Sequence, residues 1–343
     1  MSEAGLSKTT GWAALASSHP LLAFLDAALR GSGQVVFMNN PLTGALNFLA
    51  MFWGAWVGGT TLAVAFGSVV GTVVSTAVAQ AFGAERGALR KGLHGFNGML
   101  VGAGIATFLG GTALAWAVLV FASGIAAVVT LAVEKVLATW DTPGLTFPFI
   151  FTTWVVLLAA YRLPAWPIDG LPAAALAAQT AAGGVGAAGT AAAVADAFGL
   201  VEAARAVLTS VSQVFFVDDP LAGAIFLLAL AVESRRCAAL AAAGAALAVG
   251  CAWALGADRA AISHGLWGYS AVLTAPALGC VFVARTSSAL GHCAAGTLLT
   301  VILQGAFFTL AQTAGIPPLT IPFVLSTWLF LLARRGREAA PGT

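Results

Sequence analysis

Two segments of the chain carry the same hydrogen-bonding and aromatic residues at the same spacing. Residues 34–46 read Gln-Val-Val-Phe-Met-Asn-Asn-Pro-Leu-Thr-Gly-Ala-Leu, and residues 213–225 read Gln-Val-Phe-Phe-Val-Asp-Asp-Pro-Leu-Ala-Gly-Ala-Ile. A Gln amide both donates and accepts hydrogen bonds, and a Phe ring offers a flat apolar wall. Asn or Asp followed by Pro is a helix-start signal. We therefore interpret each copy as a helix start that carries an uncharged hydrogen-bonding site.

A second pair of segments places a Thr beside a Pro. Residues 145–154 and 319–328 share the pattern Leu-Thr-x-Pro-Phe and are identical at six of ten positions. Proline has no N–H, so we expect it to free the carbonyl four residues before it. Thr146 and Thr320 add hydroxyls that can donate or accept a hydrogen bond. Because unpaired carbonyls inside a membrane are tolerated only along a polar path, these segments predict the lining of such a path.

A third pair shows that the whole chain is duplicated. Residues 92–100 align with residues 265–273, which places Phe96 and Tyr269 at the same position of the two copies. The three motifs recur in the same order at offsets of 173 to 179 residues, about half of the 343-residue chain. The expected parts are a polar tail (1–11), a first membrane repeat (12–163), a linker (164–171), a second membrane repeat (172–334) and a polar tail (335–343).

The composition indicates that these repeats lie in a membrane. The chain is 60% hydrophobic and 8% charged, with a mean hydropathy of +0.95, whereas soluble domains carry about 25% charged residues. Its apolar runs are long and do not alternate as barrel strands do. With about 20 residues per crossing, we predict an all-α polytopic membrane protein whose halves each hold about five transmembrane helices and one re-entrant half-helix. An odd number of crossings inverts one half relative to the other and places the pore at their interface.

Other residue patterns exclude several function classes. The net charge of +2 gives no indication of a nucleic-acid partner. The four cysteines lie far apart and are expected to be small buried residues, and the four histidines show no metal-ligand spacing. We therefore expect no cofactor, no metal and no enzymatic activity. The basic residues at 334–337 predict cytoplasmic termini by the positive-inside rule.

The paired motifs, with His-Gly-Phe-Asn-Gly at 94–98, resemble the urea transporter family over residues 20–334. The resemblance implies a channel-like path for urea in each subunit, with two vestibule sites flanking a narrow middle, and a homotrimer in the lipid bilayer. The small size fits a bacterial member in the inner membrane. By position, the resemblance implies that one vestibule site holds Gln34, Val35 and Phe37 and the other Gln213, Val214 and Phe216, that Phe96 and Tyr269 form aromatic faces, and that Thr146 and Thr320 line the middle between Leu100 and Leu273.

Two other transport functions remain as alternatives. Members of the family vary between Gln and Glu at the two vestibule positions, and here both are Gln, so a charged vestibule ligand is not assumed. An ion-coupled secondary transporter needs an ion site, usually buried carboxylates or unwound carbonyls. An ammonium-type channel calls for paired pore histidines, but His94 aligns with Trp267 rather than with His264.

Overall fold

The computed structural model describes residues 11–166, 199–283 and 287–338, which form helices joined by short turns. Four helices are long and apolar enough to cross a membrane, at Leu62–Ala81, Ala113–Trp140, Arg235–Ala254 and Leu290–Thr313. Five further apolar helices are shorter, with 10 to 17 residues. These helices confirm the predicted all-α polytopic membrane protein. The helix expected over 172–193 falls outside the described residues.

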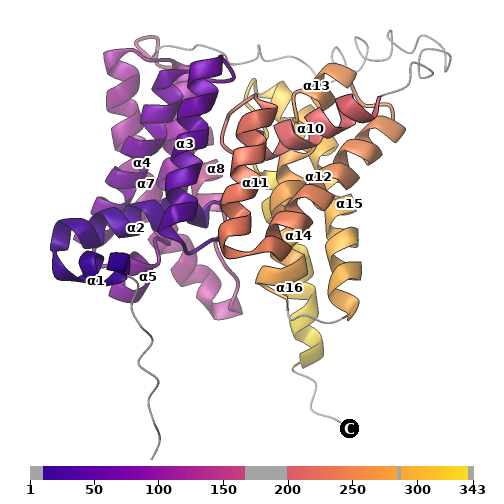
Figure 1. The fold of residues 1–343 in the computed structure, drawn as a ribbon. Coiled ribbons are helices and arrows are strands. Elements are labelled where there is room, and N and C mark those ends of the chain that lie inside the picture. Colours follow the sequence, from indigo (N-terminus) through magenta and orange to yellow (C-terminus); the bar gives the residue numbers. More distant parts are fainter. Residues whose placement is uncertain (1–10, 167–198, 284–286, 339–343) are drawn as a thin grey trace, which may run out of the picture.

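Helices with equivalent positions in the two repeats lie at opposite ends of the molecule. Figure 1 shows α5 at the lower end and α13 at the upper end. The first repeat contains α1 (Gly11–Ser18), α2 (Pro20–Gln34), α3 (Pro41–Val57), α4 (Leu62–Ala81), α5 (Arg86–Arg90), α6 (Phe96–Leu109), α7 (Ala113–Leu137), the 3-10 turn η1 (Ala138–Trp140) and α8 (Phe147–Ala160). The second contains α10 (Leu200–Gln213), α11 (Pro220–Glu233), α12 (Arg235–Ala254), α13 (Arg259–Ser263), α14 (Tyr269–Pro276), the π-helical turn η3 (Ala277–Val281), α15 (Ser287–Thr313) and α16 (Ile321–Glu338).

The predicted helix starts are confirmed at both copies of the opening motif. Asn40 caps α3 by accepting a hydrogen bond from the backbone N–H of Leu42, and Asp219 caps α11 by accepting one from Ala222. Gly31-Ser32-Gly33 has the low helix propensity that would be expected to break α2, but the helix continues to Gln34. A Cβ at Gly31 would lie 3.1 Å from the Cα of Gly95, so this glycine serves close helix packing rather than a break.

In each repeat two helices cross at a glycine. Helix α2 crosses α3, and α10 crosses α11. A Cβ built on Gly44 of α3 would lie 1.7 Å from the backbone oxygen of Leu29, and one on Gly223 of α11 would lie 2.0 Å from that of Leu208. No side chain fits at such distances. The two crossings therefore fix where Gln34 and Gln213, the last residues of α2 and α10, are presented.

The two repeats meet along α3 and α11, which run side by side through the centre of Figure 1. The hydroxyl of Thr43 donates to the backbone oxygen of Ala229 at 2.8 Å across this contact. Two further hydrogen bonds are reciprocal. Trp154 Nε1 donates to the Pro317 oxygen and Trp328 Nε1 donates to the Pro143 oxygen, each at 2.8 Å. Each repeat thus holds the bent segment before the last helix of the other.

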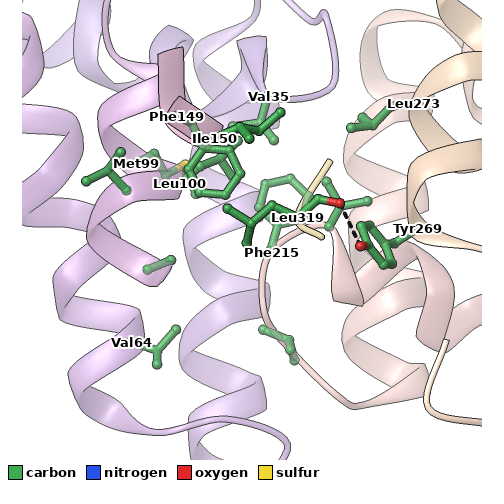
Figure 2. Close-up of a cluster of buried hydrophobic side chains, with 14 of the residues drawn as sticks. Val35, Val64, Met99, Leu100, Phe149, Ile150, Phe215, Tyr269, Leu273 and Leu319 are labelled. Carbon is green, nitrogen blue, oxygen red and sulfur yellow. Dashed lines mark hydrogen bonds between the residues drawn. The ribbon is translucent and has the colours of Figure 1, made fainter. Parts of the chain in front are cut away.

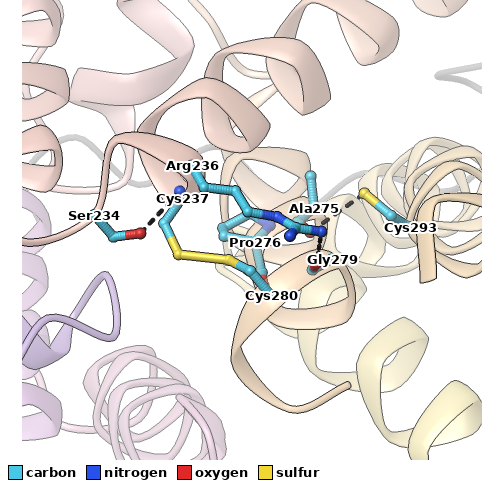
Figure 3. Close-up of a disulfide and its surroundings, with 8 residues drawn as sticks. All are labelled: Ser234, Arg236, Cys237, Ala275, Pro276, Gly279, Cys280 and Cys293. Carbon is cyan, nitrogen blue, oxygen red and sulfur yellow. Dashed lines mark hydrogen bonds between the residues drawn. A yellow bond between two sulfur atoms is a disulfide. The ribbon is translucent and has the colours of Figure 1, made fainter. Parts of the chain in front are cut away.

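Two of the four cysteines are paired, whereas the sequence had suggested that all four are isolated. Figure 3 shows Cys237, near the start of α12, in a disulfide with Cys280 of η3. The chain positions are 43 residues apart, and only the fold brings the two together. Cys293 is a buried free thiol that donates to the Ala275 oxygen at 3.3 Å, and Cys251 is a half-buried free thiol. The expectation of small buried residues holds for Cys237 and Cys293.

Candidate solute pathway

Two cavities contain most of the residues that the sequence singled out. The Gln34 vestibule, of about 490 Å³, is lined by Gln34, Val35, Phe37, Phe96 and Thr146 among others. The Gln213 vestibule, of about 650 Å³, is lined by Gln213, Val214, Phe216, Tyr269 and Thr320 among others. The first adjoins the turn after α5 and the end of α7, and the second adjoins the turn after α13. Since α5 and α13 lie at opposite ends of the molecule, the cavities enter it from opposite sides (Figure 1).

The two vestibules meet at a pair of threonines. Thr146 lines one cavity and Thr320 the other, and their hydroxyl oxygens lie 2.7 Å apart in a buried hydrogen bond. Threonine next to a helix often bonds back to its own helix, but here each hydroxyl turns to the other repeat. The contact between the two cavities therefore contains one side chain of each repeat, and we call this pair the waist.

Strained backbone marks the lining segments of both repeats. Phe37 and Phe216 have φ values of 66° and 60°, and Leu145 and Leu319 both have 51°. Non-glycine residues in this left-handed region cost roughly 1–3 kcal/mol each and concentrate at functional sites. The strain occurs at equivalent positions of the two repeats, directly beside the waist and the vestibule Gln residues.

The expectation that proline frees a backbone carbonyl is wrong for the bent segment before α8. Pro148 lies in the first turn of α8, where no intrahelical bond is lost. The Gly144 oxygen, which proline was expected to free, accepts from the Phe147 N–H at 3.2 Å. The segment bends instead at Leu145, whose backbone is left-handed with a φ of 51°. Asn97 supports this turn, donating to the Leu145 oxygen at 3.4 Å and accepting from the Phe149 N–H at 3.2 Å.

A cluster of three phenylalanines in contact forms part of the wall of each vestibule. Phe37 contacts Phe282 and Phe323, with ring centroids 5.6 and 6.1 Å apart. Phe216 contacts Phe108 and Phe149 in the same way, at 6.0 and 6.1 Å. We had selected only Phe37 and Phe216. The missed residues could have been found from the sequence, because 108 pairs with 282 and 149 with 323 at the same offset of 174 residues.

The hydroxyl of Tyr269 is hydrogen-bonded within the protein. It donates to the Leu319 oxygen at 2.7 Å and accepts from Gln304 Nε2 at 3.1 Å, as Figure 2 shows for the first of these bonds. Ser270 donates to Gln304 Oε1 at 2.9 Å and completes the network. The tyrosine therefore holds the second bent segment, as Asn97 holds the first, while its ring lines the cavity.

The two glutamines are not equivalent. Gln34 Nε2 donates to the Lys91 oxygen at 2.8 Å, and the residue lines the Gln34 vestibule. In the described part of the chain no such bond ties the side chain of Gln213. Leu100 and Leu273 are 1% and 0% exposed and lie in the packed core, outside the linings of both cavities. Their role beside the waist stays a prediction.

Histidines do not form a pair along this pathway. His94 lies in the turn before α6, is 2% exposed, and neither ring nitrogen has a hydrogen-bond partner within the described residues. Burial lowers its pKa, and the nearby Glu85 carboxylate opposes this shift. His264 is exposed and lies 2.6 Å from an Asp218 carboxylate oxygen. Neither residue lines a cavity.

Comparison with known proteins agrees with this geometry. The sequence profile of the urea transporter family matches residues 25–335. The chain is 30% identical to urea transporter 1 of Ovis aries over 322 residues, which cover 91% of this chain and 77% of that protein. It is 30% identical to urea transporter 1 of Mus musculus over 326 residues, with the same coverage. Together with the two vestibules and the waist between them, these matches show that the chain belongs to the urea transporter family.

Proposed function

We propose that this multi-pass membrane protein carries urea down its concentration gradient, through the Gln34 vestibule, the waist and the Gln213 vestibule. The observation that carries the proposal is the meeting of two cavities, which enter from opposite ends, at the hydrogen-bonded Thr146–Thr320 pair. Family membership supports urea as the solute and a transporter rather than an enzyme.

The chemistry of the lining suits a small, neutral, planar molecule rich in N–H groups. The phenylalanine walls accept a flat solute, and the amides of Gln34 and Gln213 and the hydroxyls of the waist can accept hydrogen bonds from its N–H groups. A solute that enters the waist gives up its water, and each buried polar group left unpaired costs about 1–3 kcal/mol. The two hydroxyls can exchange their mutual bond for bonds to the solute and so replace that water.

The alternatives fit less well. Ion coupling requires a site that binds the ion, whereas membership of the urea transporter family supports a neutral solute. An ammonium-type pathway would need histidines at the pore, and neither His94 nor His264 lines a vestibule. Passive flow of urea therefore remains the better reading.

Stopped-flow shrinkage of proteoliposomes under a urea gradient tests the proposal. We expect urea entry to be faster than in protein-free vesicles, and equally fast whether or not a proton or sodium gradient is present. A rate equal to that of empty vesicles would overturn urea transport. A rate that vanishes when ion gradients are dissipated would support a coupled carrier instead.

Three further features are part of the same proposal. Inverted repeats are supported by the placement of α5 and α13 at opposite ends of the molecule. Cytoplasmic termini are supported by α1 and the end of α16 lying toward one side (Figure 1). The homotrimer and the bacterial inner membrane rest on the family resemblance alone, and the mass of the purified protein in detergent would test the trimer.

A further inference from the structure

The walls of the two vestibules differ in charge, because Glu134 and Asp141 line the Gln34 vestibule, whereas the described lining of the Gln213 vestibule contains no acidic residue. Phe308 of α15 lines the Gln213 vestibule. The position 174 residues earlier is Glu134 of α7, which lines the Gln34 vestibule. Most other lining pairs are alike in type, including the two Gln, the two Val and the two Thr. A carboxylate on one side thus stands where the other side has an aromatic ring.

Glu134 is placed to reach a solute. It is half-buried at the end of α7, and its stem packs against the first bent segment, because a Cβ built on Gly144 would lie 3.7 Å from Glu134 Cγ. Gly144 is two residues from the waist threonine Thr146. The ion pairs among the described residues do not include Glu134, so no cation already occupies its carboxylate.

A second pair of equivalent positions shows the same replacement. In the second repeat, Trp267 packs against Phe308 with ring centroids 5.2 Å apart. The equivalent residues of the first repeat are His94 and Glu134, a buried imidazole without a partner in the described chain and a carboxylate. An aromatic pair of the second repeat thus corresponds to a histidine and a carboxylate in the first repeat, and of these four residues Glu134 and Phe308 line a vestibule.

We propose that Glu134 makes the Gln34 vestibule a binding subsite for N–H-rich solutes, with a preference for planar cations of the guanidinium class. The proposal rests on the proposed function, since it takes this cavity to be one entrance of the urea path. Urea and guanidinium both present parallel N–H groups, and a carboxylate accepts two of them side by side. Only guanidinium carries a positive charge, so the subsite binds it more tightly than it binds urea. Guanidinium bound in the vestibule then blocks the passage of urea.

Inhibition of urea flux by guanidinium chloride, at matched ionic strength with potassium chloride, tests this subsite. We expect Glu134→Gln and Glu134→Phe to raise the half-inhibitory guanidinium concentration about tenfold, because a charge-assisted bond is lost from a half-exposed site. Glu85→Gln is the matched control, since it removes an acidic charge from the same repeat at an exposed residue outside both cavities. The exchange Glu134→Phe with Phe308→Glu should restore inhibition by moving the carboxylate to the other vestibule.

Unchanged inhibition in Glu134→Gln would overturn the subsite, and so would an equal effect of Glu85→Gln, which would indicate general surface charge. Binding of radiolabelled guanidinium to the purified protein, measured by scintillation proximity, does not require urea flux. Binding that depends on Glu134 without any urea flux would refute the proposed function and leave the subsite standing. Urea flux without such binding would refute the subsite alone.

Discussion

Removing the waist hydroxyls one at a time and together should affect stability and flux in opposite ways. Thr146→Val leaves Thr320 Oγ1 buried without its 2.7 Å partner, and Thr320→Val does the reverse. An unpaired buried hydroxyl destabilises by about 1–3 kcal/mol, whereas removing both partners is nearly neutral. We therefore expect each single variant to be less stable than the double variant.

Flux should follow the opposite order. If each hydroxyl contributes about 1 kcal/mol to a solute in the waist, each single variant slows urea roughly fivefold, and the double variant slows it about thirtyfold. If the two threonines only packed helices, the variants that lose most stability would also lose most urea flux. Flux losses that add in the double variant, while its stability recovers, therefore exclude a packing role.

The assays are stopped-flow urea entry into proteoliposomes and thermal unfolding in detergent, on the same preparations. Thr153→Val is the control, since Thr153 is a fully buried threonine of α8 whose hydroxyl has no partner in the described chain and lies outside both cavities. It should leave flux unchanged. Wild-type flux in both single variants, or recovery of flux in the double variant, would refute the assignment of the waist.

Three other perturbations follow from the structure. Gly44→Ala should abolish expression of folded protein, since its Cβ would lie 1.7 Å from a backbone oxygen of α2. Gly250→Ala, with open space around the added Cβ, should be tolerated or stabilising. Size-exclusion profiles of the two variants test this difference. Tyr269→Phe should destabilise by about 1–2 kcal/mol and alter flux by releasing the Leu319 carbonyl, and unaltered thermal unfolding would contradict this. Because burial lowers the pKa of His94 below its usual 6.5, the unfolded chain binds that proton more readily, so stability should fall as pH drops through about 6.5; His94→Phe should flatten this dependence in thermal unfolding.

Local pattern predicted the parts of the pathway that local physics determines. Asn40 and Asp219 cap helices because of their own side chains, and the two Gln and two Thr line cavities because helix ends and bent segments present them. Glycine at residues 31 and 33 does not break α2, because close packing of Gly31 against Gly95 outweighs the low helix propensity of glycine.

Features that depend on contacts distant in sequence could not be predicted. Thr146 and Thr320 are 174 residues apart, and nothing local shows that their hydroxyls meet. The direction of the Tyr269 hydroxyl depends on Gln304 and Leu319, and the disulfide of Cys237 and Cys280 depends on how α12 packs against η3. In the sequence Glu134 lies at the end of a long apolar run, and only the fold shows that it lines a vestibule.

The reciprocal bonds of Trp154 and Trp328 have a consequence for how such a chain could arise. In a two-fold symmetric dimer, residue i of one copy contacts residue j of the other, and j contacts i. Trp154 with Pro317 and Trp328 with Pro143 obey this rule, and the threonine pair is a residue meeting its own copy on the axis. A half-length ancestor would thus form its pore only by pairing with itself, with two identical mouths. Fusion of the two genes then allows one mouth to gain a carboxylate while the other keeps an aromatic ring.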